Sequence, residues 1–235
     1  MKTIYHKSDS RGFANHGWLK SYHTFSFASY FNPERMGFGT LRVINDDTVA
    51  PKMGFGTHPH NNMEIITVPL SGALRHKDSM GNEFVIKKGE VQAMSAGTGI
   101  THSEFNASDS EEVSLLQIWV KTREKDIEPN YSQKQFDLAK RKNSLQLIVS
   151  PDGREGSTLI HQDAYFSLCD LDKGKNIAYT KKKKDNILYL FVIEGKLKVS
   201  DKELSSRDGL GITEFDSLEI SAQMNSEILL MEVPR

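Results

Sequence analysis

The 235-residue sequence contains one cysteine, Cys169, so it can form no internal disulfide. No apolar run approaches the ~20 residues that a membrane-spanning helix requires, and residues 1–7 lack the apolar segment of a signal peptide. The 30 Lys and Arg residues nearly balance 31 Asp and Glu residues, which leaves no basic excess for binding nucleic acid. These absences predict a cytoplasmic protein that binds neither a membrane nor nucleic acid directly.

Long stretches of helical periodicity are also missing. What the chain has instead is a series of short segments rich in Val, Ile, Phe and Tyr, separated by Gly, Asn and Asp. They occur at residues 40–44, 64–68, 83–86, 114–120, 145–149, 187–192 and 228–231. We expect one or two helical turns only at 133–140, in a connector. Many short strands with regular turn signals predict an all-β protein built as a sandwich or barrel.

An internal repeat indicates the number of domains. Residues 66–74 resemble residues 189–197, and residues 110–116 resemble residues 226–230. Self-similarity at this spacing predicts two related β units. The expected division is an N-terminal unit at 1–125, a connector at 126–144 and a C-terminal unit at 145–235.

Two short motifs concentrate histidine and acidic residues. They are Gly-Thr-His-Pro-His-Asn-Asn-Met-Glu at 56–64 and Gly-Thr-Gly-Ile-Thr-His-Ser-Glu at 97–104. Neutral imidazoles and carboxylates bind borderline transition metals, and residues two apart on a strand point to the same face. One His-x-His pair is unremarkable among eight histidines, but the second motif predicts a shared metal site. Its candidate ligands are His58, His60, His102 and either Glu64 or Glu104.

The C-terminal unit has lost this pattern. Counting from the repeat, Lys181 and Lys183 occupy the positions of the first histidine pair, and Leu218 and Ile220 occupy those of the second motif. Ammonium groups do not bind cations at neutral pH, so we expect this unit to be metal-free and the lysine run to be a solvated loop.

The remaining histidines are expected to be structural or solvated. His76 lies between two basic residues and suggests a solvated turn, although it could also line a pocket mouth. His16 and His23 belong to an aromatic-rich segment, where buried histidines usually satisfy backbone partners. His161 falls in the expected metal-free half, where packing or an interface is its predicted role.

These motifs resemble a known family. The pattern Gly-x-His-x-His-x(3)-Glu, then Gly-x(2)-His-x(3)-Asn, is that of the cupins, here with His58, His60, Glu64, Gly99, His102 and Asn106. More closely, the chain resembles the pirins, a bicupin subgroup, and among them the bacterial members described as quercetin 2,3-dioxygenases. The segments that carry this resemblance are 15–19, 41–47, 55–60, 76–81 and 94–104. One departure is Pro69, which cannot donate to a strand ladder and therefore predicts a bulge or an edge strand.

The resemblance implies a fold of two cupin-type jelly-roll β-barrels with one metal ion in the N-terminal barrel. Pirins bind their ion through three histidines and the glutamate of the second motif, which here are His58, His60, His102 and Glu104. Glu64 would then support these ligands from outside the coordination sphere, and Glu104 would also serve as a proton acceptor.

Four protein ligands leave two positions open on a six-coordinate ion, which is enough for catalysis. Iron(II) is the expected ion, with nickel, manganese, cobalt, copper and zinc as alternatives. The resemblance implies a dioxygenase that cleaves quercetin-like flavonols and releases carbon monoxide, with a flavonol or other phenol and dioxygen as substrates. The alternative is a pirin-type transcriptional co-regulator, in which the metal's redox state controls binding to a protein partner without turnover.

Overall fold

The computed structural model, which describes residues 1–235, confirms the all-β prediction. Its backbone divides into two compact β units. The N-terminal unit comprises residues 12–136 and 158–162, and the C-terminal unit comprises residues 1–11, 137–157 and 163–235. None of the helices has the length and hydropathy needed to cross a membrane.

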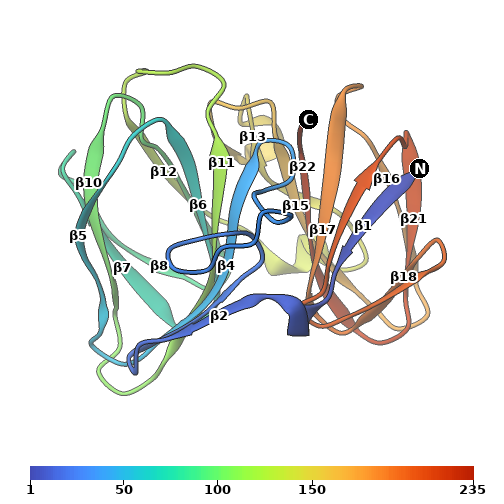
Figure 1. The fold of residues 1–235 in the computed structure, drawn as a ribbon, viewed down its shortest axis with the longest axis horizontal. Helices are drawn as coiled ribbons and strands as arrows, with labels where there is room; N and C mark the ends of the chain where they lie inside the picture. The colour runs from blue at the N-terminus through green and yellow to red at the C-terminus, as the bar shows by residue number, and fades with distance from the viewer. The chain divides into compact units, whose positions relative to one another are not determined.

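The N-terminal unit contains two antiparallel sheets (Figure 1). Its strands are β2 (Gly12–Asn15), β3 (Leu19–His23), β4 (Leu41–Val49), β5 (Gly54–His60), β6 (Met63–Ser71), β7 (Ala73–Asp78), β8 (Glu83–Lys87), β9 (Glu90–Ser95), β10 (Ile100–Asn106), β11 (Val113–Lys121), β12 (Asn130–Gln135) and β14 (Thr158–Leu159). One sheet has the order β12-β9-β6-β11-β4-β3-β2, and the other has the order β5-β10-β7-β8. Side chains alternate between the two faces of each strand, so every second residue can point into the barrel.

A glycine turn and a β-bulge fix the register of β6, a central strand of the first sheet. Gly72 ends the strand with a φ of 69°, and a Cβ at this position would lie 2.9 Å from the carbonyl oxygen of Glu112. Only glycine adopts this conformation without strain. The register between β6 and β11 shifts at Ser114 and Leu115, beside Pro69. This irregularity is the bulge that the proline predicts, although β6 is not an edge strand.

The C-terminal unit repeats the arrangement. Its elements are β1 (Lys2–His6), η1 (Ser8–Ser10), η2 (Leu138–Arg141), β13 (Gln146–Ser150), η3 (Arg154–Gly156), β15 (Tyr165–Leu171), β16 (Asn176–Thr180), β17 (Asn186–Glu194), β18 (Lys196–Val199), β19 (Lys202–Ser205), β20 (Gly209–Thr213), β21 (Ser217–Ala222) and β22 (Ser226–Pro234). The order β16-β21-β18-β19 corresponds strand by strand to β5-β10-β7-β8, and β20-β17-β22-β15 corresponds to β9-β6-β11-β4. The repeat in the sequence therefore reflects two copies of one topology.

The unit boundaries differ from those drawn from the sequence. Strand β1 pairs with β20, and the Tyr5 hydroxyl donates to Asp208 at 2.5 Å, so the first residues belong to the C-terminal unit. Figure 1 shows this blue strand among the orange and red strands of that unit. The expected connector contains β12, which pairs with β9 and gives that strand its second neighbour. Of the one or two helical turns expected at 133–140, a single 3₁₀ turn forms, η2 at Leu138–Arg141, while residues 133–135 belong to β12.

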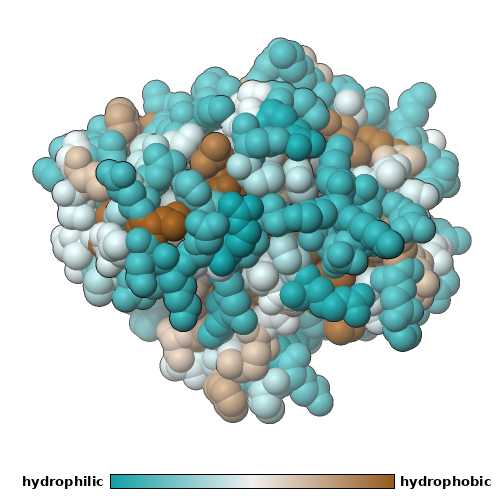
Figure 2. All heavy atoms as spheres, turned by 90° about the horizontal axis from the view of Figure 1, so that it is seen from above, coloured by the Kyte–Doolittle hydropathy of each residue, from teal (hydrophilic) through white to brown (hydrophobic).

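Exposed apolar side chains are scattered on the face seen in Figure 2. The face seen in Figure 2 is mainly hydrophilic, with hydrophobic residues in small separate areas. Scattered exposed apolar groups are normal for a folded protein surface.

Hydrophobic packing fills the place in the C-terminal unit that corresponds to the histidine cluster. Tyr179 pairs with Leu218 on β16 and β21, as His58 pairs with His102 on β5 and β10. The strand register thus puts Tyr179, rather than Lys181, at the position of His58. Tyr179, Leu218 and Ile220 all join the apolar core of the unit.

The lysine run is an exposed loop, as expected, and it is anchored through its backbone. The fully buried carboxylate of Glu232 accepts hydrogen bonds from the amides of Lys182 (2.7 Å) and Lys183 (2.9 Å). It also accepts from the Tyr179 hydroxyl at 2.7 Å and from the Asn186 side chain at 3.0 Å. Four donors around one buried carboxylate make Glu232 the anchor of this loop.

We predict that Glu232→Gln destabilises the protein by about 1–3 kcal/mol, because one carboxylate oxygen is replaced by an NH₂ group that faces other donors. Urea unfolding measures this loss. The control is Glu219→Gln, on the exposed face of β21, which should change the free energy of unfolding by less than about 0.5 kcal/mol. Equal stability of the two variants would contradict the anchoring role.

Candidate metal centre

Three histidines meet on the paired strands β5 and β10. The backbone register places His58 opposite His102 and His60 opposite Ile100. Their rings lie close together, with centroid separations of 4.4 Å for His58–His102, 4.8 Å for His58–His60 and 4.8 Å for His60–His102. One nitrogen from each ring lies within 4.8 Å of the others. The expected convergence of the two sequence motifs is therefore present in the fold.

The hydrogen bonds of these rings leave nitrogen lone pairs available for a cation. The His58 ring donates through Nδ1 to the carbonyl oxygen of Gly56 at 2.8 Å, because a carbonyl only accepts, and Nε2 is then the nitrogen that can bind a cation. His102 is buried, and its Nε2 has no hydrogen-bond partner. Burial and the neighbouring His58 lower the pKa of His60 to about 4. Burial and the other histidines also lower the pKa of His102, so both rings are neutral at pH 7.

Glu104 is buried near His102, beyond a register shift in β10. Its two carboxylate oxygens accept from Gln117 Nε2 at 3.1 and 2.9 Å, and Thr67 donates to Gln117 Oε1 at 2.8 Å. Burial raises the pKa of Glu104 to about 7, and the nearby Asp47 contributes to the rise. Glu104 has a ligating atom within 4.8 Å of His102 and His76, but it is not part of the compact group of His58, His60 and His102.

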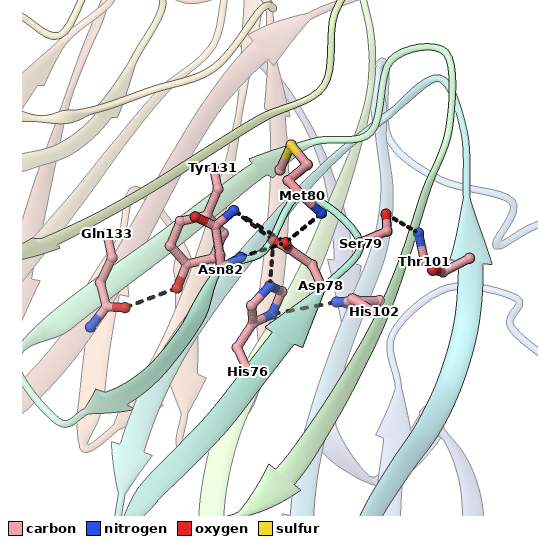
Figure 3. A network of polar contacts seen from close by, with 9 residues as sticks. All are labelled: His76, Asp78, Ser79, Met80, Asn82, Thr101, His102, Tyr131 and Gln133. Carbon is pink, nitrogen blue, oxygen red and sulfur yellow. Dashed lines mark hydrogen bonds and ion pairs between the residues drawn. The ribbon is translucent and has the colours of Figure 1, made fainter.

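His76 is fully buried, so the expectation of a solvated turn residue is wrong. On β7 it lies opposite Glu104, and its Nε2 is 3.0 Å from the Asp78 carboxylate (Figure 3). Its Nδ1 is 3.5 Å from Nδ1 of His102, and the ring of Tyr131 packs on it with centroids 4.8 Å apart. Alternation along the strand buries His76 even though its sequence neighbours are basic and exposed.

Several hydrogen-bond donors surround the Asp78 carboxylate. Its Oδ1 accepts from the backbone amides of Met80 (2.9 Å) and Asn82 (3.1 Å), and the Asn82 side chain donates to Oδ2 at 2.9 Å (Figure 3). Burial would raise the pKa of Asp78, but the hydrogen bonds from Asn82 and His76 outweigh it and lower the pKa. Asp78 is therefore a fixed carboxylate beside His76.

Glu64 lies apart from the histidines. Its carboxylate accepts from the Ser95 hydroxyl at 2.6 Å and from the His161 amide at 3.2 Å. On β6 its neighbour Ile65 packs with Trp119, which lines the cavity, so alternation places Glu64 on the opposite face. These contacts do not give Glu64 the supporting role expected from the sequence. They also place His161 in the N-terminal unit rather than in the C-terminal half.

A cavity of about 480 Å³ opens beside the histidines. Its walls are mainly aromatic and apolar, with a few polar groups among them. The lining residues are Ala14, His16, Trp18, Leu19, Ser21, His23, Phe27, Ala28, Ser29, Asn45, Asp47, Phe55, His58, His60, Glu104, Gln117 and Trp119. This volume is within the range of small-molecule sites in proteins.

Several cavity residues were missed or given only structural roles in the sequence analysis. His16 and His23 line the cavity, as does Asp47. Within β4, Asn45, Asp47 and Val49 alternate with the opposite face, a pattern visible in the sequence. The pattern does not say which face points inward, because both faces of this strand are largely buried.

The loop between β3 and β4 forms part of the cavity wall and is attached to the sheet by hydrogen bonds and an aromatic contact. Arg42 Nη1 donates to the carbonyl oxygen of Ser26 at 2.6 Å, and the Ser26 amide donates to Arg35 at 2.6 Å. Phe27 packs edge-on against Trp119 with ring centroids 5.3 Å apart. The wall is thus fixed by backbone hydrogen bonds and an aromatic contact.

Comparison with known proteins places this site in a family. The Pirin family model matches residues 6–120, and a model described as the quercetinase C-terminal cupin domain matches residues 147–233. A protein of Escherichia coli K12 named quercetin 2,3-dioxygenase is 45% identical over 228 residues, which are 97% of each chain. A pirin-like protein of Caulobacter vibrioides is 38% identical over 95% of this chain and 96% of its own.

Solved structures agree with these matches. The crystal structure of the bacterial pirin YhhW from Escherichia coli in complex with nickel(II) superposes with a TM-score of 0.94 at 42% identity, covering 99% of both chains. A quercetin 2,3-dioxygenase from Acinetobacter baumannii, 21% identical, covers 98% of this chain and 85% of its own with a TM-score of 0.77 and supports the fold alone. The chain belongs to the pirin family, with two cupin barrels and a sequence that is quercetin 2,3-dioxygenase-like over nearly its whole length.

Proposed function

We propose that this protein is a metal-dependent dioxygenase that cleaves quercetin-like flavonols and releases carbon monoxide. The observation that carries the proposal is the convergence of three histidines beside an aromatic cavity, with the buried Nε2 of His102 lacking any protein partner. An unpartnered buried nitrogen is costly unless something binds it. A transition-metal cation among these rings removes that cost.

The donor set suits one divalent ion held by His58, His60, His102 and Glu104. Imidazole nitrogens with a carboxylate suit iron, nickel, manganese, cobalt, copper or zinc, and geometry and availability decide among them. We favour iron(II), although the related YhhW structure contains nickel(II). When bound, the ion supplies Lewis-acid chemistry that lowers the pKa of a hydroxyl group bound to it.

Residues of this chain would orient the ligands. His76 donates through Nε2 to Asp78, so its Nδ1 is an acceptor that faces Nδ1 of His102. This arrangement keeps the His102 proton on Nδ1 and directs Nε2 toward His58 and His60. Histidine ligands in metal sites are commonly fixed by such outer partners.

Glu104 is suited to accept the substrate proton. It lines the cavity, and the chain from Thr67 through Gln117 fixes its orientation. A carboxylate held at the cavity wall can take a proton from a phenolic hydroxyl and later return it.

The cavity fits the proposed substrate class. Trp18, Phe27, Phe55 and Trp119 provide flat apolar walls for a planar flavonol. In the proposed reaction both atoms of dioxygen enter the substrate, and one of its carbons leaves as carbon monoxide. An accessible cavity at the histidines favours this activity over the alternative of a closed, redox-sensing protein-interaction module.

The first test is metal removal. We predict that a chelator abolishes both quercetin turnover and the absorption shift on binding, and that iron(II), manganese or nickel restores them to different degrees. Oxygen uptake and carbon monoxide release measure turnover. His102→Ala should bind no stoichiometric metal and stay inactive after reconstitution. Quercetin binding that needs metal but yields no carbon monoxide with any ion would overturn the dioxygenase and favour the non-catalytic alternative.

The second test separates the two glutamates. Glu104→Gln should lose metal or nearly all turnover, because a neutral amide is a poor ligand and cannot take the proton. Glu64→Gln should retain full metal content, because Glu64 faces Ser95 rather than the histidines. Metal analysis and turnover of both purified variants give the answer. Metal loss in the Glu64 variant with full occupancy in the Glu104 variant would exchange their roles.

The third test concerns the orientation of His102. Asp78→Asn should weaken metal binding by roughly 10-fold or more, because the fixed carboxylate that directs the His76 proton is lost. Competition with a chromogenic chelator measures the affinity. Glu83→Gln, at an exposed position on β8, is the matched control and should leave affinity unchanged. Identical affinities of the two variants would remove His76 and Asp78 from the metal site.

A further inference from the structure

A second carboxylate, Asp47, is buried in the wall of the cavity. It lies on β4, is 3% exposed and lines the same cavity as His58 and Glu104. Nothing in the proposed metal chemistry uses it. A buried carboxylate is costly in an apolar setting unless hydrogen bonds satisfy it.

Hydrogen bonds from the protein satisfy only one of the two oxygens of the Asp47 carboxylate. Ser21, its neighbour on β3, makes a hydrogen bond with it, while Asp47 Oδ1 has no hydrogen-bond partner. Nearby polar groups of the cavity have other partners. Asn45 Oδ1 is 2.8 Å from His23 Nδ1, and the Gln117 amide donates to Glu104. Asp47 Oδ1 is therefore an acceptor without a protein donor.

The rest of the wall indicates what kind of donor would approach. Trp18 packs edge-on against Phe55 with centroids 5.3 Å apart, and Phe27 packs in the same way against Trp119. These apolar faces suit an aromatic ring rather than a strongly hydrated ligand. A hydroxyl on such a ring is a neutral donor that can reach a buried acceptor with little desolvation cost.

We infer that Asp47 determines substrate specificity by accepting a hydrogen bond from a ring hydroxyl of the bound aromatic ligand. This inference rests on the proposed function, and it narrows the substrate class. The preferred ligand is a polyphenol with at least one hydroxyl in addition to the group that binds the metal. A site built around an unpaired acceptor discriminates strongly against analogues without the matching hydroxyl.

The test compares two flavonols in a thermodynamic cycle. Quercetin carries several ring hydroxyls, whereas 3-hydroxyflavone carries only the one proposed to bind the metal. Binding of each to the metal-loaded protein is measured without oxygen by tryptophan fluorescence, for the wild type, Asp47→Ala and Asp47→Asn. Metal content and melting temperature establish that the variants are folded and loaded.

We expect the wild type to bind quercetin at least about tenfold more tightly than 3-hydroxyflavone. Asp47→Ala should lose most of this preference through weaker quercetin binding, and Asp47→Asn should reduce it. Asp46→Asn, one residue along on the other face of β4, should keep the wild-type preference.

Two outcomes would overturn the inference, and they differ in what else they remove. In one, both flavonols bind with the same preference for quercetin in the wild type and both Asp47 variants. In that case Asp47 does not bind the ring hydroxyl, and the proposed function stands. If neither flavonol binds the metal-loaded wild type, the flavonol activity falls together with the inference.

Discussion

The pairing of β5 with β10 is the constraint on which the site depends. A strand register is all-or-none, because a slip by one residue turns every side chain to the other face. In the observed register His58 faces His102, and the regular alternation along β10 places His102 and Glu104 on the same, buried face. Had β10 slipped by one residue, Thr101 and Ser103 would face inward and the histidine cluster would not exist. Gly97 and Gly99, which both have positive φ, form the turn that leads into β10.

Buried polar groups beside the paired strands β5 and β10 form two hydrogen-bonded chains. One leads from Thr67 through Gln117 to Glu104, and the other leads from Asp78 through His76 to His102. Each begins at a residue fixed by the backbone or by strand pairing, so the orientation of the last group is set by the groups that precede it in the chain. In the C-terminal unit the equivalent strands hold Tyr179, Leu218 and Ile220, and packing takes the place of polar chains. One topology therefore supports either a reactive interior or an inert core.

The histidine cluster could be predicted from sequence because its information is local: two short motifs with period-two spacing. The choice between Glu64 and Glu104 could not, since it depends on which face of β6 points inward, and both faces of that strand are buried. His76 was misjudged because its sequence neighbours are exposed and basic, although the alternation along β7 was visible. The pairing of β1 with β20 left no local signal, because it joins opposite ends of the sequence. Family resemblance favoured Glu104 where residue patterns alone left both open, and the structure places Glu104 in the cavity wall.

The place of β1 has a consequence for how the protein is made. Strand β1 is synthesised more than 200 residues before its sheet partner, β20. Until β1 and β20 pair, the backbone donors and acceptors of β1 remain unpaired, and β20 has an open edge of the kind that invites association with other chains. Closing such a long loop is slow compared with forming neighbouring hairpins. The strands of the N-terminal barrel are close in sequence, so this barrel can complete most of its pairing first. Strand β1 would then join its sheet after the barrel that follows it in the sequence has formed.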